Sequence, residues 1–264
     1  RMFEASRLIR TEIDTLFGLM VKSEVDWSLP PPLVLQEYLN ASGSLLEHLH
    51  HALSGAWLQG FTAEAEASKS FNPFERAEAL REPIFYGGES AYNFQYVDFA
   101  PRRYAADAAW LQEHRGYSIA TAAIVARAVE RVRAAKFVTL REEMRKLHPD
   151  QWTMLPFFAV SVAEVSAEAE LQAETAERIL GSFALPPGER NAGFNALNDF
   201  NVVAATPLLR MPNGEYLSLQ VYSLAEALYD APFYWMAQDK AYLPTLARNR
   251  GRFTEDFVAE RLRL

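Results

Sequence analysis

The sequence predicts a mainly α-helical protein that carries one small β-hairpin. Apolar residues recur at helical spacing through most of the 264 residues. The clearest β signal is the Asn213-Gly214 turn, which lies between two short apolar segments. Hydrophobic residues make up 50% of the chain and charged residues 23%, the composition of a globular protein with an apolar core.

The composition excludes several classes of protein. The chain has no cysteine, which excludes disulfides and thiolate metal sites. With no apolar signal sequence at its start, the chain is expected to be cytoplasmic. No segment approaches the ~18 apolar residues that cross a bilayer, so no membrane partner is expected. The net charge of −8 opposes general binding to nucleic-acid phosphates.

Residues 1–115 are expected to form an N-terminal helical domain. Helices are predicted over 3–22 and 33–58, with a proline-rich break at 30–32 between them. Residues 82–104 are rich in aromatic side chains and contain Gly87-Gly88, so they are interpreted as an ordered, partly buried loop with short strand or helix fragments. A helix over 104–112 follows and is expected to end at Gly116.

Residues 116–190 are expected to form a helical, winged-helix-like unit. Ser118 is the predicted N-cap of a helix over 119–136, and Ser161 with Glu164 matches a capping box. A further helix is predicted over 170–183. The succession of helix, turn and helix is typical of a helix-turn-helix or winged-helix unit, and small helical bundles share it.

Residues 191–250 are expected to combine the β-hairpin with helices. The hairpin spans 208–219, Ser223 is the predicted N-cap of a helix over 224–229, and another helix follows Pro232 to about residue 248. An amphipathic helix is predicted to begin at 251–254 and to continue to residue 264 without a stop signal. Residues 251–264 are therefore expected to open a truncated α/β domain, and the chain to be the front part of a longer protein.

Two groups of residues suggest chemistry only weakly. His48, His50 and His51 lie close enough on a helix for two imidazoles to share a face, but no further ligand has metal-site spacing, so no metal site is predicted.

Residues 88–92 partly match the G-x-S-x-G nucleophile elbow, with Ser90 as its serine. Asp98 and His114 follow Ser90 in the order of a Ser-Asp-His triad. However, the second glycine of the motif is missing and no parallel sheet is predicted, so a packed aromatic loop is favoured over a hydrolase site.

The densest basic stretch of the chain supplies the candidate binding residues. These are Arg127, Arg131, Arg141 and Arg145, which would contact nucleic acid or a protein partner. Acidic residues at 130, 142 and 143 interrupt the stretch, so a solvated helix face is the favoured interpretation.

Segments 82–101, 197–242 and 249–262 resemble a region of uncharacterised bacterial proteins that precedes a restriction-endonuclease-like domain of the PD-(D/E)XK or nuclease-related type. The resemblance implies a regulatory or recognition region, itself non-catalytic, of a metal-dependent nuclease. A G-x-F-x-E pattern places Glu255 as an acidic contributor to a Mg²⁺ site, with Glu260 a lesser candidate. The core Asp and x-Lys motif are absent from these residues. Mg²⁺ would therefore belong to the parent protein, and no cofactor is expected in this chain.

The alternative hypothesis is a protein–protein interaction or oligomerisation module without a nucleic-acid role. The acidic balance and exposed aromatic residues such as Trp235 favour it. The first hypothesis expects DNA contact through the parent protein, and the second expects a protein partner or a homo-oligomer. Salt-dependent DNA binding distinguishes them, because contacts to phosphate release counterions.

Overall fold

The computed structural model describes residues 10–23, 92–148, 151–152, 155–196, 199–218 and 220–263, with positions 41, 43–45, 47–48 and 52 described singly. Most of the helix predicted over 33–58 and the glycine pair at 87–88 lie outside the described residues. The first described helix is α1 (Arg10–Met20), within the helix predicted over 3–22. Among the described segments, each helix is too short or too polar to cross a lipid bilayer.

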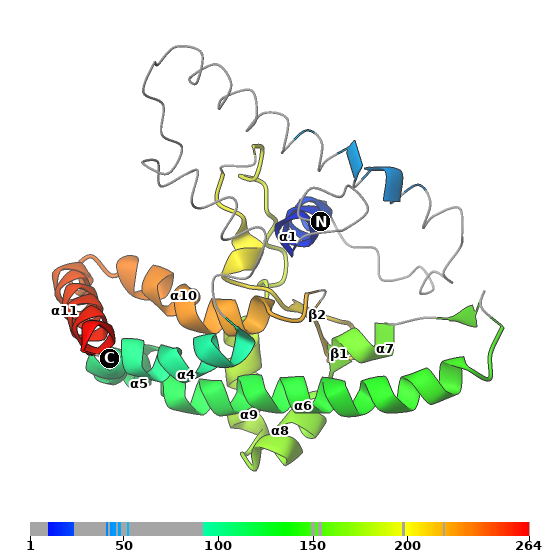
Figure 1. Ribbon diagram of the computed structural model, residues 1–264, viewed down its shortest axis with the longest axis horizontal. Coiled ribbons are helices and arrows are strands. Elements are labelled where there is room, and N and C mark those ends of the chain that lie inside the picture. Colours follow the sequence, from blue (N-terminus) through cyan, green and yellow to red (C-terminus); the bar gives the residue numbers. More distant parts are fainter. Residues whose placement is uncertain are drawn as a thin grey trace.

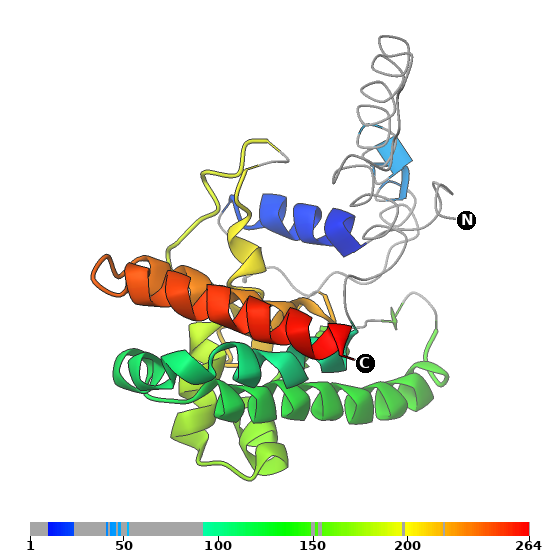
Figure 2. The ribbon, with the colours of Figure 1, turned by 60° about the vertical axis from the view of Figure 1, so that its left-hand side comes forward.

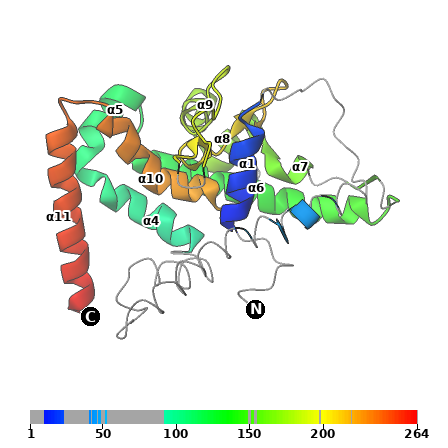
Figure 3. The same ribbon diagram turned by 90° about the horizontal axis from the view of Figure 1, so that it is seen from above.

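The long helix α6 (Ile119–Met144) is the centre of the described fold. Helices α4 (Asn93–Arg103) and α10 (Ser223–Ala237) cover one side of it. Helices α8 (Val162–Ala169) and α9 (Ala173–Ser182) lie on the other side (Figure 1). Helix α11 (Leu243–Leu262) runs beside α4 and α10, as Figures 2 and 3 show. The prediction of a mainly helical protein is confirmed.

A small antiparallel sheet lies at the side of this helical body. Its strands are β1 (Ala159–Val160), β2 (Leu209–Arg210) and β3 (Tyr216–Leu217), in the order β1-β3-β2. The predicted hairpin is therefore confirmed as β2–β3, with Leu209 opposite Leu217. The sequence did not predict β1, because two residues are too few to show a strand period.

The hairpin turn uses its glycine differently from the prediction. A two-residue turn would need positive φ at both Asn213 and Gly214, but only Gly214 has it, at 86°. Gly214 N donates to Met211 O at 2.9 Å, and Met211 N donates to Glu215 O at 2.8 Å. Asn213 Oδ1 accepts from Glu215 N at 3.1 Å. The connection is therefore a three-residue loop that ends in a left-handed glycine.

The interpretation of residues 82–104 as a loop with short strand or helix fragments needs correction over 93–103, where the chain forms the continuous 11-residue helix α4. Residues 82–91 lie outside the described residues. The aromatic and apolar side chains of α4 follow a helical stripe, with Tyr96, Val97 and Ala100 buried. Gln95 Oε1 accepts from Tyr92 N at 2.9 Å at the start of the helix. Pro101 lies in the last turn, where it removes one helical hydrogen bond without ending the helix.

Several predicted helix ends need correction. Helix α6 continues to Met144 rather than residue 136, and α9 begins at Ala173 because Glu170 takes a left-handed φ of 54° as the C-cap of α8. The helix predicted over 104–112 is a 3-10 turn, η2 (Ala105–Asp107), followed by α5 (Ala108–Arg115). The predicted end at Gly116 is confirmed by its φ of 75°.

The helices near the end of the chain are longer than predicted. Helix α10 begins at Ser223 itself, with Tyr222 as N-cap, and passes through Pro232. Helix α11 begins at Leu243 and passes through Gly251, so no helix starts at 251–254. The boundary predicted between residues 250 and 251 therefore falls inside a continuous helix. An interior glycine costs a helix only ~1 kcal/mol, which packing readily overrides.

The described residues contain two apolar clusters. The larger cluster joins α4, α5, α6, α8, α9 and α10, and Leu246 of α11 is fully buried in it. Trp235, expected to be exposed, is buried in this cluster, with its ring 5.2 Å from that of Phe183. The smaller cluster packs Phe17 of α1, and Val21 just after it, against β1, β2 and β3. Helix α11 thus shares the core of the other helices, at least at its N-terminal end.

Candidate interaction site

The C-terminal turns of α6 carry an exposed apolar surface. Phe137, Leu140 and Met144 recur at a spacing of three and four, and Leu147 continues the stripe in the turn beyond the helix. Together with Trp152, and with the exposed Val138 one turn before Arg141, they form what is here named the α6-end surface. Phe137 is 42% exposed and Leu147 46%. A groove of about 340 Å³ is lined by Phe137, Leu140, Arg141, Met144, Arg145 and Trp152.

Trp152 is held against the end of α6 by its own indole. The Nε1 group donates to Met144 O at 2.7 Å and to Leu147 O at 3.3 Å. Met144 O, at the end of α6, also accepts from Leu147 N at 3.1 Å, so the indole gives this carbonyl a second donor. On the preceding turn, Phe137 meets Phe157 edge to face, with ring centroids 5.5 Å apart. The aromatic groups of the surface are therefore held in place by the fold.

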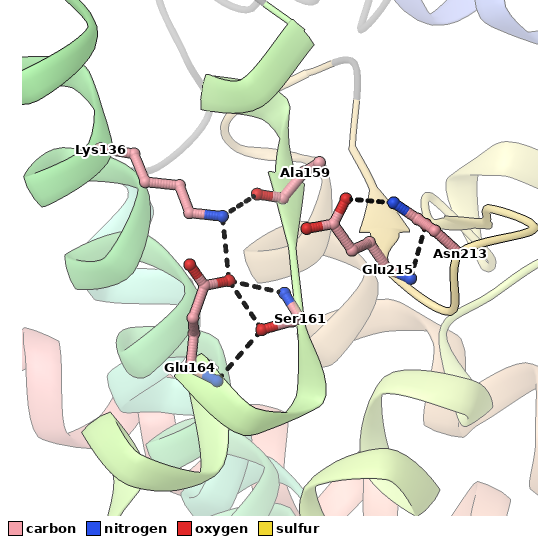
Figure 4. A network of polar contacts seen from close by, with 6 residues as sticks. All are labelled: Lys136, Ala159, Ser161, Glu164, Asn213 and Glu215. Atoms are coloured by element: carbon pink, nitrogen blue, oxygen red, sulfur yellow. Dashed lines mark hydrogen bonds and ion pairs between the residues drawn. The ribbon is translucent and has the colours of Figure 1, made fainter.

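A polar network anchors α6 immediately before this surface. Lys136 Nζ donates to Ala159 O and to Glu164 Oε2, both at 2.9 Å. Glu164 also accepts from the backbone and hydroxyl of Ser161, each at 2.8 Å (Figure 4). Burial opposes ionisation of Glu164, but the Ser161 N–H and Lys136 outweigh it and lower its pKa. This confirms the capping box predicted at Ser161 and ties α6 to β1 and α8.

The structure separates the four predicted binding arginines into two pairs. Arg127 forms an ion pair with Asp98, and Arg131 forms one with Glu168. Arg141 and Arg145 instead line the groove of the α6-end surface. The four side chains therefore do not form one basic patch, and two of them already have carboxylate partners.

Carboxylates also hold the basic groups around α8 and α9. Glu174 pairs with Arg178 at 2.8 Å, and Glu177 pairs with Arg210 of β2 at 2.8 Å. The exposed side of α9 thus presents acidic residues next to arginines that they neutralise. Such a face offers little attraction to a phosphate backbone, since nucleic-acid affinity depends on cationic side chains that are free to replace counterions.

The remaining predicted site residues do not come together. Glu255 is exposed on α11, and Glu260 bonds Arg102 at 2.5 Å. No group of three metal-ligating side chains occurs within the described ranges. His48 is exposed, whereas His50, His51 and Ser90 lie outside those ranges. Of the other two triad candidates, Asp98 pairs with Arg127, and His114 stacks on Trp110 at 4.2 Å.

Sequence reasoning missed a buried polar cluster around Asp107, which is fully buried. Tyr242 Oη donates to Asp107 Oδ1 at 2.8 Å, Asn249 Nδ2 donates to the same oxygen at 2.6 Å, and Arg250 pairs with Oδ2. Burial lowers the pKa of Arg250, while Asp107 opposes that change. The partners are more than 130 residues apart in sequence, so no local pattern could reveal them. The cluster fixes α11 to η2.

No protein-family model, curated protein or solved structure gives a significant match to this chain. The physical chemistry of its surfaces is therefore the basis for a functional proposal. Among the described residues, the α6-end surface combines exposed aromatic groups, an apolar groove and two arginines, which is the composition of protein interaction sites.

Proposed function

We propose that this chain is an interaction module that binds a second copy of itself through the α6-end surface. The exposed apolar stripe on α6 carries the proposal. Contiguous apolar groups rimmed by polar residues mark protein interaction sites, and Trp and Arg are enriched among the residues that dominate binding energy. Trp152, Arg141 and Arg145 supply these residue types around one groove.

The charges beside the stripe favour a second copy as the partner. Arg141 and Arg145 alternate with Glu142 and Glu143 along the last turns of α6. In a two-fold contact the same patch meets itself, so a patch with both signs of charge can pair opposite charges. The spacing of three and four between Phe137, Leu140 and Met144 is also the spacing at which paired helices interlock.

The order of elements supports a second candidate function, a winged-helix recognition or regulatory region. From α6 the chain runs through the short helix α7 (Leu155–Phe158), β1, α8, α9, the 3-10 turn η4 (Val202–Ala204), β2 and β3, with the sheet order β1-β3-β2. Without α7 and η4, this order resembles the helix, strand, helix, helix, strand, strand order of a winged helix. In that arrangement α9 occupies the position of the recognition helix.

Under this second candidate, the chain regulates a metal-dependent nuclease of the PD-(D/E)XK type and is itself non-catalytic. Mg²⁺ would be held by the parent protein, and the exposed Glu255 on α11 would be accessible to ligands from another domain. The ion pairs on α9 favour contact with a protein rather than with DNA. Both candidates therefore assign a binding role to this chain.

Sedimentation velocity of the chain over a range of concentrations tests the first proposal. We expect a dimer that dissociates on dilution, and a monomer for the double variant Val138→Glu, Leu147→Glu, because both side chains are exposed on the α6-end surface. Asp256→Asn, on the exposed side of α11, is the matched control and should dimerise normally. A wild-type chain that stays monomeric at every concentration contradicts the proposal.

Fluorescence polarisation with duplex DNA at low salt tests the second candidate. Tight binding that weakens steeply with salt, and that is lost in Arg178→Glu on the exposed side of α9, would support DNA recognition by this chain. Weak binding that is insensitive to salt would support a role in protein contacts. The two measurements are independent, so each candidate can fail without the other.

A further inference from the structure

Among the described residues, Arg133 is a buried charged side chain that forms no ion pair. It lies on α6 between Val129 and Phe137 and is only 3% exposed. Within the described part of the chain, its Nε and Nη2 groups have no hydrogen-bond partner. Leaving a buried charge unpaired costs several kcal/mol, so such a group calls for a compensating ligand or contact.

Arg133 lines a cavity of about 210 Å³, together with residues from the N-terminal turns of α4 and α10. Figure 1 shows that these two helices lie next to each other above α6. Apolar side chains make up most of the cavity wall: Val97, Ala126, Val129, Phe157, Leu224 and Ala225. Its polar lining consists of Asn93, Glu130 and Arg133. Glu130 and Val221, also in the lining, are exposed, so the cavity is accessible from solvent.

Aromatic contacts account for only part of the stabilisation of Arg133. Its guanidinium lies 4.9 Å from the centroid of Phe157 and 5.3 Å from that of Phe158. A ring face attracts a cation but accepts no strong hydrogen bond, so the two N–H groups stay unsatisfied. Burial lowers the pKa of Arg133 to about 10, with Glu130 opposing the change, so the group remains charged near pH 7.

We propose that this cavity binds a small monocarboxylate with an apolar body, held by Arg133. The Nε–H and Nη2–H groups lie on one edge of the guanidinium and match the two oxygens of a carboxylate. The apolar wall accommodates the rest of the molecule. Glu130 at the cavity disfavours a phosphate, which carries nearly twice the charge of a carboxylate.

Asn93 refines the class of ligand. Its side-chain oxygen is buried beside the cavity and has no hydrogen-bond partner in the described residues. A hydroxyl group on the ligand would satisfy this acceptor, so a hydroxy acid should bind more tightly than the plain acid. This site is distinct from the α6-end surface, and the proposal does not depend on dimerisation.

Calorimetric titration of the whole chain with isocaproate, its hydroxy analogue leucic acid, neutral isocaproamide and inorganic phosphate tests the site. We expect isocaproate to bind, leucic acid to bind more tightly, and the amide and phosphate not to bind. Arg133→Met should weaken binding at least ~10-fold, because a charge-assisted pair is lost. Arg252→Met, on the exposed side of α11 and outside the cavity, should bind as the wild type does.

The ¹⁵N resonance of the Arg133 Nε–H group gives a readout that does not depend on a variant folding. Isocaproate should shift this resonance and leave that of Arg141 in place. The proposal is overturned if neither carboxylate binds at about 10 mM, where even millimolar affinity is visible. It is equally overturned if phosphate or the amide binds as well as the acid, or if the Arg133 resonance does not move.

Discussion

Asp107 and Arg250 form an ion pair in the protein interior, where their side chains are 0% and 13% exposed. The pair joins η2 to the middle of α11, next to the bonds that Tyr242 and Asn249 make to the same carboxylate. The arginine also lies over the ring of Tyr104, at 4.5 Å. Helix α11 is therefore connected to the body of the protein by buried charge as well as by Leu246.

Replacing Asp107 with Ala should destabilise the protein by about 3–5 kcal/mol, because it leaves the buried Arg250 without its partner. Urea unfolding measures this change. Asp256→Ala is the matched control, since Asp256 pairs with Arg252 at 3.8 Å on the exposed side of the same helix. That control should change stability by less than ~1 kcal/mol. Equal effects of the two substitutions would show that the Asp107 cluster does not secure α11.

Ser161→Ala should cost about 1 kcal/mol of stability, because Ser161 Oγ caps the start of α8 by accepting from Glu164 N at 3.2 Å. Thermal unfolding monitored by circular dichroism would report the loss. Ser166→Ala, one turn further along the same helix, removes a hydroxyl that caps no helix and should have a smaller effect. A cost at Ser166 equal to that at Ser161 would contradict the capping role.

Glu164 should make stability depend on pH in the acid range. Burial by itself would raise the pKa of Glu164, but the hydrogen bonds from Ser161 and Lys136 have the larger combined effect. The pKa in the folded protein is therefore lower than the ordinary value of 4.5. The contribution of Glu164 is therefore complete above pH 4.5 and is lost as the pH falls through the lower folded pKa. The stability difference between wild type and Glu164→Gln should shrink on acidification through this window. A difference that stays constant down to low pH would contradict the assignment.

Tyr242 should make the protein sensitive to alkali. Burial, and then its bond to Asp107, raise its pKa from 10.0 to about 12. Because the folded state favours the neutral phenol, the contribution of Tyr242 is complete below pH 10 and is lost as the pH rises through about 12. Wild type should lose stability faster than Tyr242→Phe across this interval, measured by urea unfolding at each pH. Parallel losses in the two proteins would rule out this role for the phenol.

Local signals in the sequence predicted the parts of the fold that local physics controls. The caps at Ser118 and Ser161 and the helix end at Gly116 each depend on side chains within a few residues. The hairpin turn at Gly214 also depends only on residues close to it in the sequence. These elements could be read directly from the sequence.

The features that depend on long-range packing could not be predicted in this way. Strand β1 depends on the pairing of Ala159 with Leu217. Helix α11, which runs through Gly251, is held by the ion pair between Arg250 and Asp107. The burial of Arg133 could not be predicted either. Arg133 lies in the same basic stretch of sequence as exposed arginines, but its side chain is buried. Helical position alone did not separate it from Arg131, which pairs with Glu168 at the surface.

The absence of native cysteine allows single cysteines to be placed without interference. Val138→Cys and Leu147→Cys put thiols on the α6-end surface, and Glu255→Cys puts one on the exposed side of α11. A short bis-maleimide reagent, followed by denaturing gels, then reports which positions meet in a dimer. The three variants differ only in where the thiol lies.

This crosslinking measurement shows whether two copies of the chain meet at the α6-end surface. We expect a covalent dimer for the cysteines at 138 and 147, increasing with protein concentration, and little for the cysteine at 255. Equal crosslinking at all three positions, or none at 138 and 147, would contradict the proposed dimer.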